Sequence, residues 1–245
     1  MTAAILVIGD EILSGRTQDT NTAYIARFLA SLGIDLREAR VVPDSQHEIV
    51  AAVNALRARF DYVFTTGGIG PTHDDITADA IAAAFGVGID YHPDALAMLG
   101  ARYKPGEFNE MRKRMARIPL TATLVKNSVS TAPGFQIENV FVMAGVPMIM
   151  RAMLEDIAPR LRRGAQVSVE TVQTRLPEGR IAAGLAQIQK DHPELSVGSY
   201  PFYREDGNGV QLVVRGRDPA AVEAAAAAIE QMVRAEGGVA QRLPK

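Results

Sequence analysis

A glycine-rich segment that ends in two adjacent carboxylates runs from Thr66 to Asp75, with the sequence Thr-Gly-Gly-Ile-Gly-Pro-Thr-His-Asp-Asp. Gly67, Gly68 and Gly70 allow backbone N–H groups to approach a phosphate, which the N-terminus of a following helix also favours. No Lys-Ser or Lys-Thr pair follows, and the glycine spacing differs from the dinucleotide fingerprint. A tight turn closed by an N-capping aspartate needs fewer special residues than these. The segment therefore predicts a phosphate site of its own kind, with Thr72 in the loop.

Carboxylates recur in the loops that are expected beside this segment. Asp74 and Asp75 end it, and Asp10, Glu11 and Asp44 follow two earlier apolar runs. Carboxylates beside a phosphate repel it unless a divalent cation lies between them. We therefore expect a magnesium-type ion, with Asp75 as the catalytic acid of the adjacent pair because it is nearer the helix start. For each acid taken alone, the alternative is a solvated turn residue or a helix cap.

A second polar loop lies at Asn127–Gly134. It offers the hydroxyls of Ser128 and Ser130 and a turn backbone at Gly134, which could bind a second phosphate or a ribose. A plain Pro-Gly turn explains this loop equally well.

The main basic cluster is Arg112-Lys-Arg114 together with Arg117. It could form a lid over an anionic ligand. A solvated helix face is the alternative, because charged residues at this spacing commonly lie on the outside of a helix.

An alternation of apolar runs and helical patterns must position these loops. An apolar run at residues 3–8 predicts a buried strand, and residues 35–42 and 62–65 are further strand candidates. Helical patterns separate them, the second opened by a capping-box pattern at Ser45-Gln-His-Glu48, and a further helix is expected over residues 76–85. This order predicts an α/β fold with a parallel sheet and helices on both faces. Ligands of such sheets bind beyond the carboxyl ends of the strands, where the glycine-rich and acidic loops lie.

The remaining patterns complete this unit and add a smaller one. In the first unit we expect helices at residues 93–103 and 107–117, strands at 122–126 and 140–143, and a last helix from 147 to about 161.

The pattern changes after residue 163, so we expect two domains, 1–163 and 164–245. The second shows a βαββα order with a turn at Asp206–Gly209 between its last two strands. That order predicts a small antiparallel sheet covered by two helices on one face, an α+β domain.

Composition excludes several classes of protein. The 245 residues carry 26 Lys and Arg against 28 Asp and Glu, which leaves no broad cationic field for a nucleic-acid backbone. The absence of Cys and the presence of only four His favour oxygen ligands for any metal. No stretch approaches the roughly 18 to 20 apolar residues of a membrane span, and no basic segment opens the chain. We therefore expect a cytoplasmic protein without a nucleic-acid or membrane partner.

Four motifs resemble the MoaB/Mog (molybdopterin-binding) domain, and most closely the nucleotide-processing domain of competence/damage-inducible protein A, CinA. The motifs are Gly9-Asp-Glu-Ile-Leu-Ser-Gly15 with Asp19-Thr-Asn21, Thr66–Thr77, Thr131-Ala-Pro-Gly-Phe135 and Ala144-Gly-Val-Pro147. Residues 164–245 resemble the small domain that follows it in CinA-like proteins and in the molybdopterin-binding half of FAD synthases. Two positions depart from the CinA-like pattern, namely Ser130 and Ala144.

The resemblance implies a three-layer αβα fold and a small-molecule ligand, a nucleotide or pterin phosphate bound at the glycine loop. It also implies that Asp75 and Asp44 hold a divalent cation, Mg²⁺, and support catalysis, that Glu11 and Asn21 belong to the site beside Asp10, and that the protein is a homo-oligomer. No amidase domain of full CinA proteins is present in these residues.

The leading hypothesis is therefore metal-dependent hydrolysis of a nucleotide pyrophosphate of the ADP-ribose or FAD class. Two alternatives remain open at this point. One is adenylyl transfer to molybdopterin in molybdenum cofactor biosynthesis, and the other is a non-catalytic module that binds a nucleotide or pterin.

Overall fold

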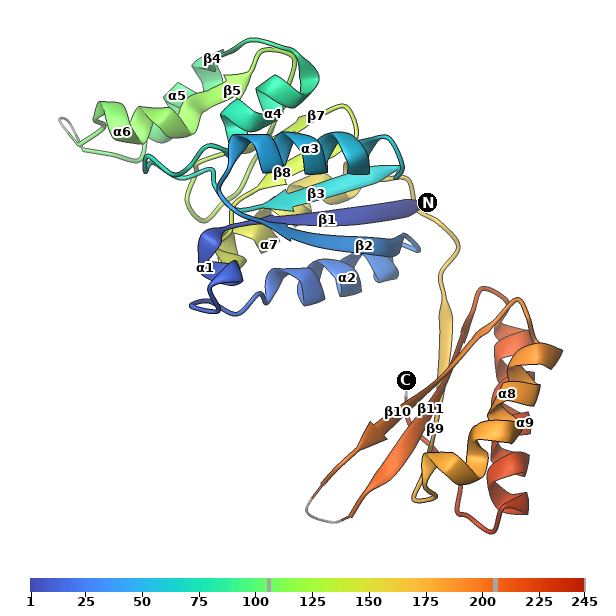
Figure 1. Cartoon of the computed structure of the whole chain (residues 1–245). Coiled ribbons are helices and arrows are strands. Elements are labelled where there is room, and N and C mark those ends of the chain that lie inside the picture. The colour runs from blue at the N-terminus through green and yellow to red at the C-terminus, as the bar shows by residue number, and fades with distance from the viewer. Residues whose placement is uncertain (105–106, 205–206, 245) are drawn as a thin grey trace. The chain divides into compact units, whose positions relative to one another are not determined.

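The computed structural model describes residues 1–104, 107–204 and 207–244. The chain divides into two compact units, Met1–Gly164 and Ala165–Lys245, each with its own sheet (Figure 1). Asp206, in the turn expected between the last two strands of the second unit, lies outside the described residues.

Six strands form the sheet of the larger unit in the order β2-β1-β3-β8-β7-β6. They are β1 (Thr2–Ile8), β2 (Asp35–Val42), β3 (Tyr62–Thr66), β6 (Thr123–Val125), β7 (Gly134–Ile137) and β8 (Val140–Met143). The first four in the sheet order are parallel, and β7 and β6 run antiparallel to their neighbours. Because the ends of parallel strands meet at one edge, the loops after β1, β2, β3 and β8 share that edge.

Helices cover both faces of this sheet, which confirms the three-layer αβα architecture (Figure 1). Side chains of β1 alternate between two cores, with Leu6 and Ile8 in one and Ile5 and Val7 in the other. The first core is closed by α3 (Gln46–Arg57), α4 (Thr77–Phe85) and α5 (Pro93–Gly100), and the second by α2 (Asn21–Ser31) and α7 (Pro147–Ile157). The sheet edge that carries the loops is thereby held between two packed layers.

Shorter elements complete the larger unit. They are α1 (Asp10–Leu13), β4 (Ile89–Tyr91), α6 (Glu110–Lys113), the 3₁₀ turns η1 (Arg114–Ala116) and η2 (Ala158–Arg160), and β5 (Arg117–Pro119). The acidic residues expected in an open loop after β1 therefore begin a short helix.

The single helix expected over residues 107–117 was wrong. Asn109 caps α6 through its side chain, which accepts a hydrogen bond from the N–H of Arg112 at 3.0 Å. After one 3₁₀ turn the chain becomes strand β5, which pairs antiparallel with β4 through Tyr91 and Arg117. Pairing between distant segments thus outweighs the local helical spacing.

The capping box expected at Ser45–Glu48 was also wrong. Ser45 is the N-cap residue of α3, but its side chain makes no capping hydrogen bond. In α2, by contrast, Asp19 accepts hydrogen bonds from the N–H groups of Asn21 and Thr22 at 2.9 and 3.1 Å, so the carboxylate caps that helix.

The smaller unit has the expected βαββα order and ends in an additional short strand. Its antiparallel sheet has the order β10-β11-β9-β12, and both helices cover one face (Figure 1). The elements are β9 (Ser168–Thr174), α8 (Glu178–Asp191), β10 (Ser196–Phe202), β11 (Gly209–Gly216), α9 (Pro219–Ala235) and β12 (Gln241–Arg242).

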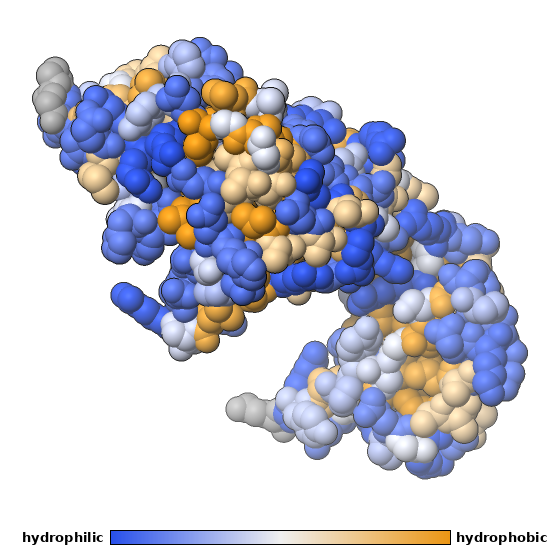
Figure 2. All heavy atoms as spheres, turned by 45° about the horizontal axis from the view of Figure 1, so that its top comes forward, coloured by the Kyte–Doolittle hydropathy of each residue, from blue (hydrophilic) through white to orange (hydrophobic). Residues whose placement is uncertain are grey.

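Hydrophilic residues cover much of the visible surface of both units (Figure 2). Over the described ranges of the chain, no helix is both long enough and apolar enough to cross a bilayer.

Candidate functional site

The glycine loop after β3 has a backbone that only glycine tolerates. Gly67 and Gly68 have φ angles of 107° and 65°, in the left-handed region. A Cβ atom at Gly67 would overlap the carbonyl oxygen of Ile8, the last residue of β1. Thr77, the first residue of α4, donates from its hydroxyl to the Gly67 carbonyl and from its N–H to the Gly68 carbonyl, both at 3.0 Å. The loop is therefore held between β1 and α4.

Three consecutive N–H groups of this loop are available to a ligand. The N–H of Gly67 donates to the Met143 carbonyl at 3.2 Å. Across the described part of the chain, the N–H groups of Gly68, Ile69 and Gly70 have no protein acceptor. Successive unpaired N–H groups near a helix N-terminus form a concave anion site.

Asp75 closes this loop and does not cap α4. Its Oδ2 accepts hydrogen bonds from the N–H and the hydroxyl of Thr72, at 2.8 and 2.5 Å. The N-cap residue of α4 is Ile76, which makes no side-chain capping bond. A Cβ atom at Gly70 would lie 2.6 Å from Asp75 Oδ2, so the carboxylate rests directly against the glycine backbone.

Asp44 is the centre of an acidic group on the same edge. Its Oδ2 accepts a hydrogen bond from the N–H of Asp10 at 3.0 Å, and its Oδ1 would lie 3.6 Å from a Cβ atom at Gly68. Burial raises the pKa of Asp44, and the carboxylates of Asp10, Glu11 and Asp74 raise it further, against the opposing hydrogen bond from Asp10. The structure thus places four of the five predicted acids, namely Asp10, Glu11, Asp44 and Asp74, near one another, and the fifth, Asp75, directly follows Asp74 in the chain.

These acids have no cationic partner from the protein. Within residues 1–104, 107–204 and 207–244, neither Asp44 nor Asp75 forms an ion pair with Lys or Arg, and Asp74 has only the histidine ring of His73 at 3.9 Å. Negative charge near a potential phosphate site is therefore left uncompensated.

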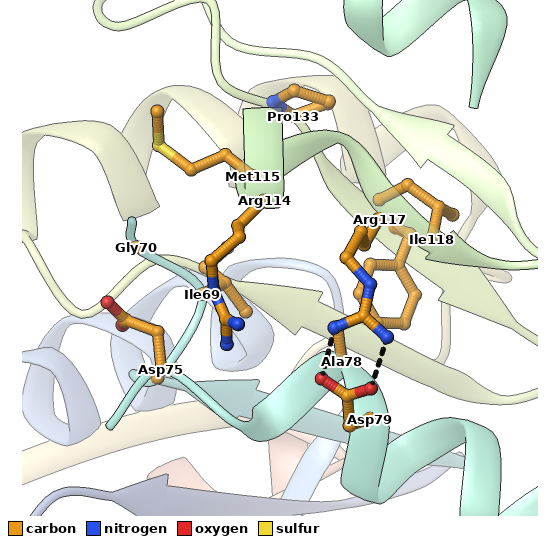
Figure 3. Close-up of a pocket in the computed structure, with 12 residues that line it drawn as sticks. Ile69, Gly70, Asp75, Ala78, Asp79, Arg114, Met115, Arg117, Ile118 and Pro133 are labelled. Atoms are coloured by element: carbon orange, nitrogen blue, oxygen red, sulfur yellow. Dashed lines mark hydrogen bonds and ion pairs between the residues drawn. The ribbon is translucent and has the colours of Figure 1, made fainter. Parts of the chain in front are cut away.

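Two cavities flank the glycine loop. The first, of about 20 Å³, is lined by Gly68, Gly70, Asp75, Arg114 and Phe135 among others, and Figure 3 labels Gly70, Asp75 and Arg114 in its wall. The sequence identified Arg114 only as one of several basic residues and Phe135 only as the last residue of the Thr131–Phe135 motif.

The second cavity, of about 70 Å³, lies on the other side of the loop and is lined by Glu11, Asn21, Gly67 and Gly145 among others. Asn21 is only 7% exposed and donates from Nδ2 to the Gly145 carbonyl at 2.8 Å. Its Oδ1 is buried and has no donor among the residues that the structure describes. A ligand hydroxyl or amino group would satisfy this oxygen.

The loop between β6 and β7 reaches the same edge through residues other than those predicted. Ser128 is exposed and lines neither cavity in the described structure. Gly134 is buried at the start of β7, where a Cβ atom would overlap the Val142 carbonyl oxygen. Its neighbours Pro133 and Phe135 line the first cavity.

Comparison with known proteins assigns the larger unit to a family. Residues 4–163 match the family described as "Probable molybdopterin binding domain". The chain belongs to this family. Residues 166–242 match "FAD synthase, middle domain". The MoaB/Mog and CinA-like resemblance of the sequence motifs is thereby confirmed.

Relatives of this molybdopterin-binding family extend over most of the chain. A protein of Archaeoglobus fulgidus is 33% identical over 229 residues, which cover 94% of this chain and 96% of the relative. A CinA-like protein of Syntrophotalea carbinolica is 39% identical over 172 residues, or 66% of this chain and 42% of the relative. The crystal structure of a CinA protein with unknown function from Thermoplasma acidophilum is 36% identical, has a TM-score of 0.62 and covers 65% of this chain and 96% of its own.

Proposed function

We propose that this chain hydrolyses the phosphoanhydride bond of a nucleotide diphosphate of the ADP-ribose or FAD class, with the help of a divalent cation. The observation that carries the proposal is the set of three unpaired N–H groups at Gly68, Ile69 and Gly70, beside carboxylates that have no cationic partner. Membership of a molybdopterin-binding family and the match to a FAD synthase domain support a nucleotide or pterin phosphate as the ligand class.

The residues present fit Mg²⁺ in a shared site. Asp75 and Asp44 each use one oxygen for a hydrogen bond within the chain, which leaves the other for an ion. Among the described residues, no three His, Cys, Asp or Glu side chains gather closely enough to hold a metal alone. Mg²⁺ commonly takes one or two carboxylates and completes its shell with substrate phosphates and water. When bound, the ion would neutralise charge on the phosphoryl oxygens.

The residues of the chain would have separate roles in the proposed hydrolysis. Gly68, Ile69 and Gly70 would hold the diphosphate through their N–H groups, while Gly67, whose N–H is bonded to the Met143 carbonyl, gives the loop its shape. Thr72 would keep Asp75 oriented. Asp75 and Asp44 position the attacking water, whose oxygen bonds to one phosphorus as the bridging oxygen leaves with the other phosphoryl group.

The rest of the rim would contact the ligand away from the reacting bond. Glu11 and Asn21 line the larger cavity, where the buried Asn21 Oδ1 would accept a hydrogen bond from the ligand, and Asp10 lies beside Asp44. Ser128 and Gly134 remain candidates for contact with a second phosphate or a ribose.

The test is to incubate the purified full chain with ADP-ribose, FAD and NAD, with Mg²⁺ or Co²⁺ and with EDTA, and to separate the products. We expect cleavage that requires the metal and falls by at least about 100-fold in Asp75→Asn. Asp90→Asn is the matched control, because Asp90 is exposed and its side chain bonds only the adjacent N–H of Tyr91. Intact substrates, or equal activity of Asp75→Asn, would refute hydrolysis.

Two other outcomes would replace the proposal. Release of pyrophosphate from ATP only in the presence of molybdopterin would assign adenylyl transfer. Calorimetric binding of a nucleotide or pterin with no product after long incubation would assign a binding module.

A further inference from the structure

Arg114 differs from every other basic residue of its segment. It lies in η1, between α6 and β5, and its Nε is buried without a hydrogen-bond partner. Within the described residues it also forms no ion pair. An arginine with a buried, unsatisfied donor is costly to the folded state unless an acceptor arrives from outside the chain.

Its neighbours are all occupied within the protein. Arg112 stacks on the ring of Tyr103 with 4.3 Å between its guanidinium carbon and the ring centroid. Lys113 pairs with Glu110 at 2.6 Å.

Arg117 is held as firmly, since it forms a bidentate pair with Asp79 at 2.7 and 2.9 Å. Figure 3 shows the side chain of Arg114 extending towards the glycine loop, between Asp75 and the Arg117–Asp79 pair. Of the four basic residues of this cluster, Arg114 alone is directed into the cavity with its charge unused.

The cavity itself limits what can enter it. Its volume of about 20 Å³ is close to the space of a single water molecule, so it admits phosphoryl oxygens and not a nucleoside. A nucleoside must then lie outside it, and the larger cavity beside Asn21, of about 70 Å³, offers polar groups of Glu11, Thr17 and Asn21 that could contact part of one.

We propose that Arg114 binds the second phosphoryl group of the ligand, opposite the phosphoryl group held by the N–H groups of Gly68–Gly70. This inference rests on the proposed function for the ligand's class and adds a determinant of specificity, the selection of diphosphates over monophosphates. The planar guanidinium presents paired donors that match phosphate oxygens, and hydrogen bonds between charged groups are the strong ones.

The experiment compares a diphosphate with a monophosphate by isothermal titration calorimetry, in the presence of Mg²⁺. The probes are α,β-methylene-ADP, whose bridge resists hydrolysis, and AMP. We expect Arg114→Met to raise the Kd for α,β-methylene-ADP by about 10- to 100-fold and the Kd for AMP by less than about 3-fold. Arg114→Lys keeps the charge without the fork and should fall between the wild type and Arg114→Met.

Arg112→Met is the matched control, because it removes the same charge from the same segment outside the cavity, and both Kd values should stay near those of the wild type. Equal loss of both ligands in Arg114→Met, no loss of either, or equal affinity of the wild type for both would overturn the inference. A fall in Tm as large as that of Arg117→Met, which breaks the pair with Asp79, would assign Arg114 a structural role and overturn it as well.

Failure of hydrolysis is distinguishable from failure of this inference. If the wild type binds α,β-methylene-ADP through Arg114 but leaves ADP-ribose intact, the hydrolase proposal fails and the role of Arg114 stands. If ADP-ribose is cleaved and Arg114→Met binds α,β-methylene-ADP as tightly as the wild type, the hydrolase proposal stands and the role of Arg114 fails.

Discussion

Charged side chains have opposite surroundings in the two units of the chain. In the smaller unit, Arg242 contacts three carboxylates, at 3.0 Å from Glu170, 2.9 Å from Glu223 and 2.6 Å from Glu230. The hydrogen bonds that Arg242 donates to Glu223 first, and then to Glu230 and Glu170, raise the pKa of Arg242 above its ordinary value, against the lowering effect of burial. At the strand-end edge of the larger unit, Asp44 has acidic neighbours and no cation from the protein.

In the smaller unit opposite charges neutralise one another, whereas the acids around Asp44 do not, which fits the ligand site that we propose there. A network of opposite charges contributes to stability only when its members neutralise one another. Like charges that are gathered at one edge lower stability, so their retention fits a binding site better than a structural role. At that edge the positions of the groups are fixed by the backbone of the glycine loop. In the smaller unit the ion pairs around Arg242 fix the positions of the charged side chains themselves.

The largest effect should come from breaking that backbone with Gly67→Ala. The new Cβ would overlap the Ile8 carbonyl oxygen in a left-handed conformation, so we expect a loss of about 3 kcal/mol or more in the free energy of unfolding. Gly15→Ala is the control, because Gly15 also has a positive φ, of 72°, but open space around it, and should lose only about 1 kcal/mol. Denaturant titration measures both, and equal losses would mean that the loop is not held by β1.

A smaller effect should come from removing the centre of the charge network with Arg242→Met. The side chains of Glu170 and Glu230 are only 9% and 19% exposed, and both would lose the ion pair with Arg242, while Glu230 keeps its pair with Arg234. Because Arg242 itself is partly exposed, we expect a loss of about 1 to 3 kcal/mol in the smaller unit. Arg234→Met removes an exposed pair with Glu230 and should lose at most about 0.5 kcal/mol.

Hydrogen exchange resolved by unit measures these losses separately from the ligand site. A loss of nucleotide binding in Arg242→Met, with stability unchanged, would contradict the division between the two regions.

The smallest effect should be a gain in stability from Asp44→Asn. Since the pKa of Asp44 is raised in the folded state, its ionisation opposes folding once the pH rises above the ordinary value of an aspartate, about 3.9. Asparagine keeps an acceptor for the N–H of Asp10 and carries no charge. We therefore expect a Tm higher by about 1 to 3 °C near pH 7 and no difference below about pH 3.

Asp61→Asn should change the Tm in the opposite direction in the same thermal scans. Hydrogen bonds from Thr2 lower the pKa of Asp61, so its charge favours folding at neutral pH and that contribution is lost as the pH falls through the lowered pKa. Asp61→Asn should therefore lower the Tm near pH 7 and have no effect in acid. A Tm of Asp44→Asn that is lower than the wild type at pH 7 would show that the acidic edge is structural.

The sequence predicts the sheet and its loop-bearing edge well, because these follow from local patterns. β2 and β8 begin and end at the predicted residues, and the loops that begin at Gly9 and Gly67 follow β1 and β3, whose residues are almost all buried. The short elements between Glu107 and Pro119 were not predicted, because the pairing of β5 with β4 is a contact between segments distant in the chain.

For the same reason the sequence could not separate Arg114 from its neighbours. The sequence shows four basic residues close together and nothing that distinguishes one from another. Only the positions of Tyr103, Glu110 and Asp79 in the fold determine that Arg112, Lys113 and Arg117 have partners and that Arg114 is left for a ligand. The proximity of the acids, by contrast, could be predicted from the sequence, because the carboxyl ends of parallel strands lie at the same edge of a sheet.

The close packing of the glycine loop also bears on how this scaffold could acquire new ligands. Gly67 lies against the end of β1, and a Cβ atom at Gly145 would come within 3.3 Å of the Gly67 Cα, so the loop cannot change shape without moving two strand ends. Its anion site is consequently set before any ligand arrives, and little conformational entropy is lost on binding. Sequence changes that alter ligand specificity are then expected in the segments around the loop. The short segment that carries Arg114 is the one that can change with the least effect on the rest of the fold.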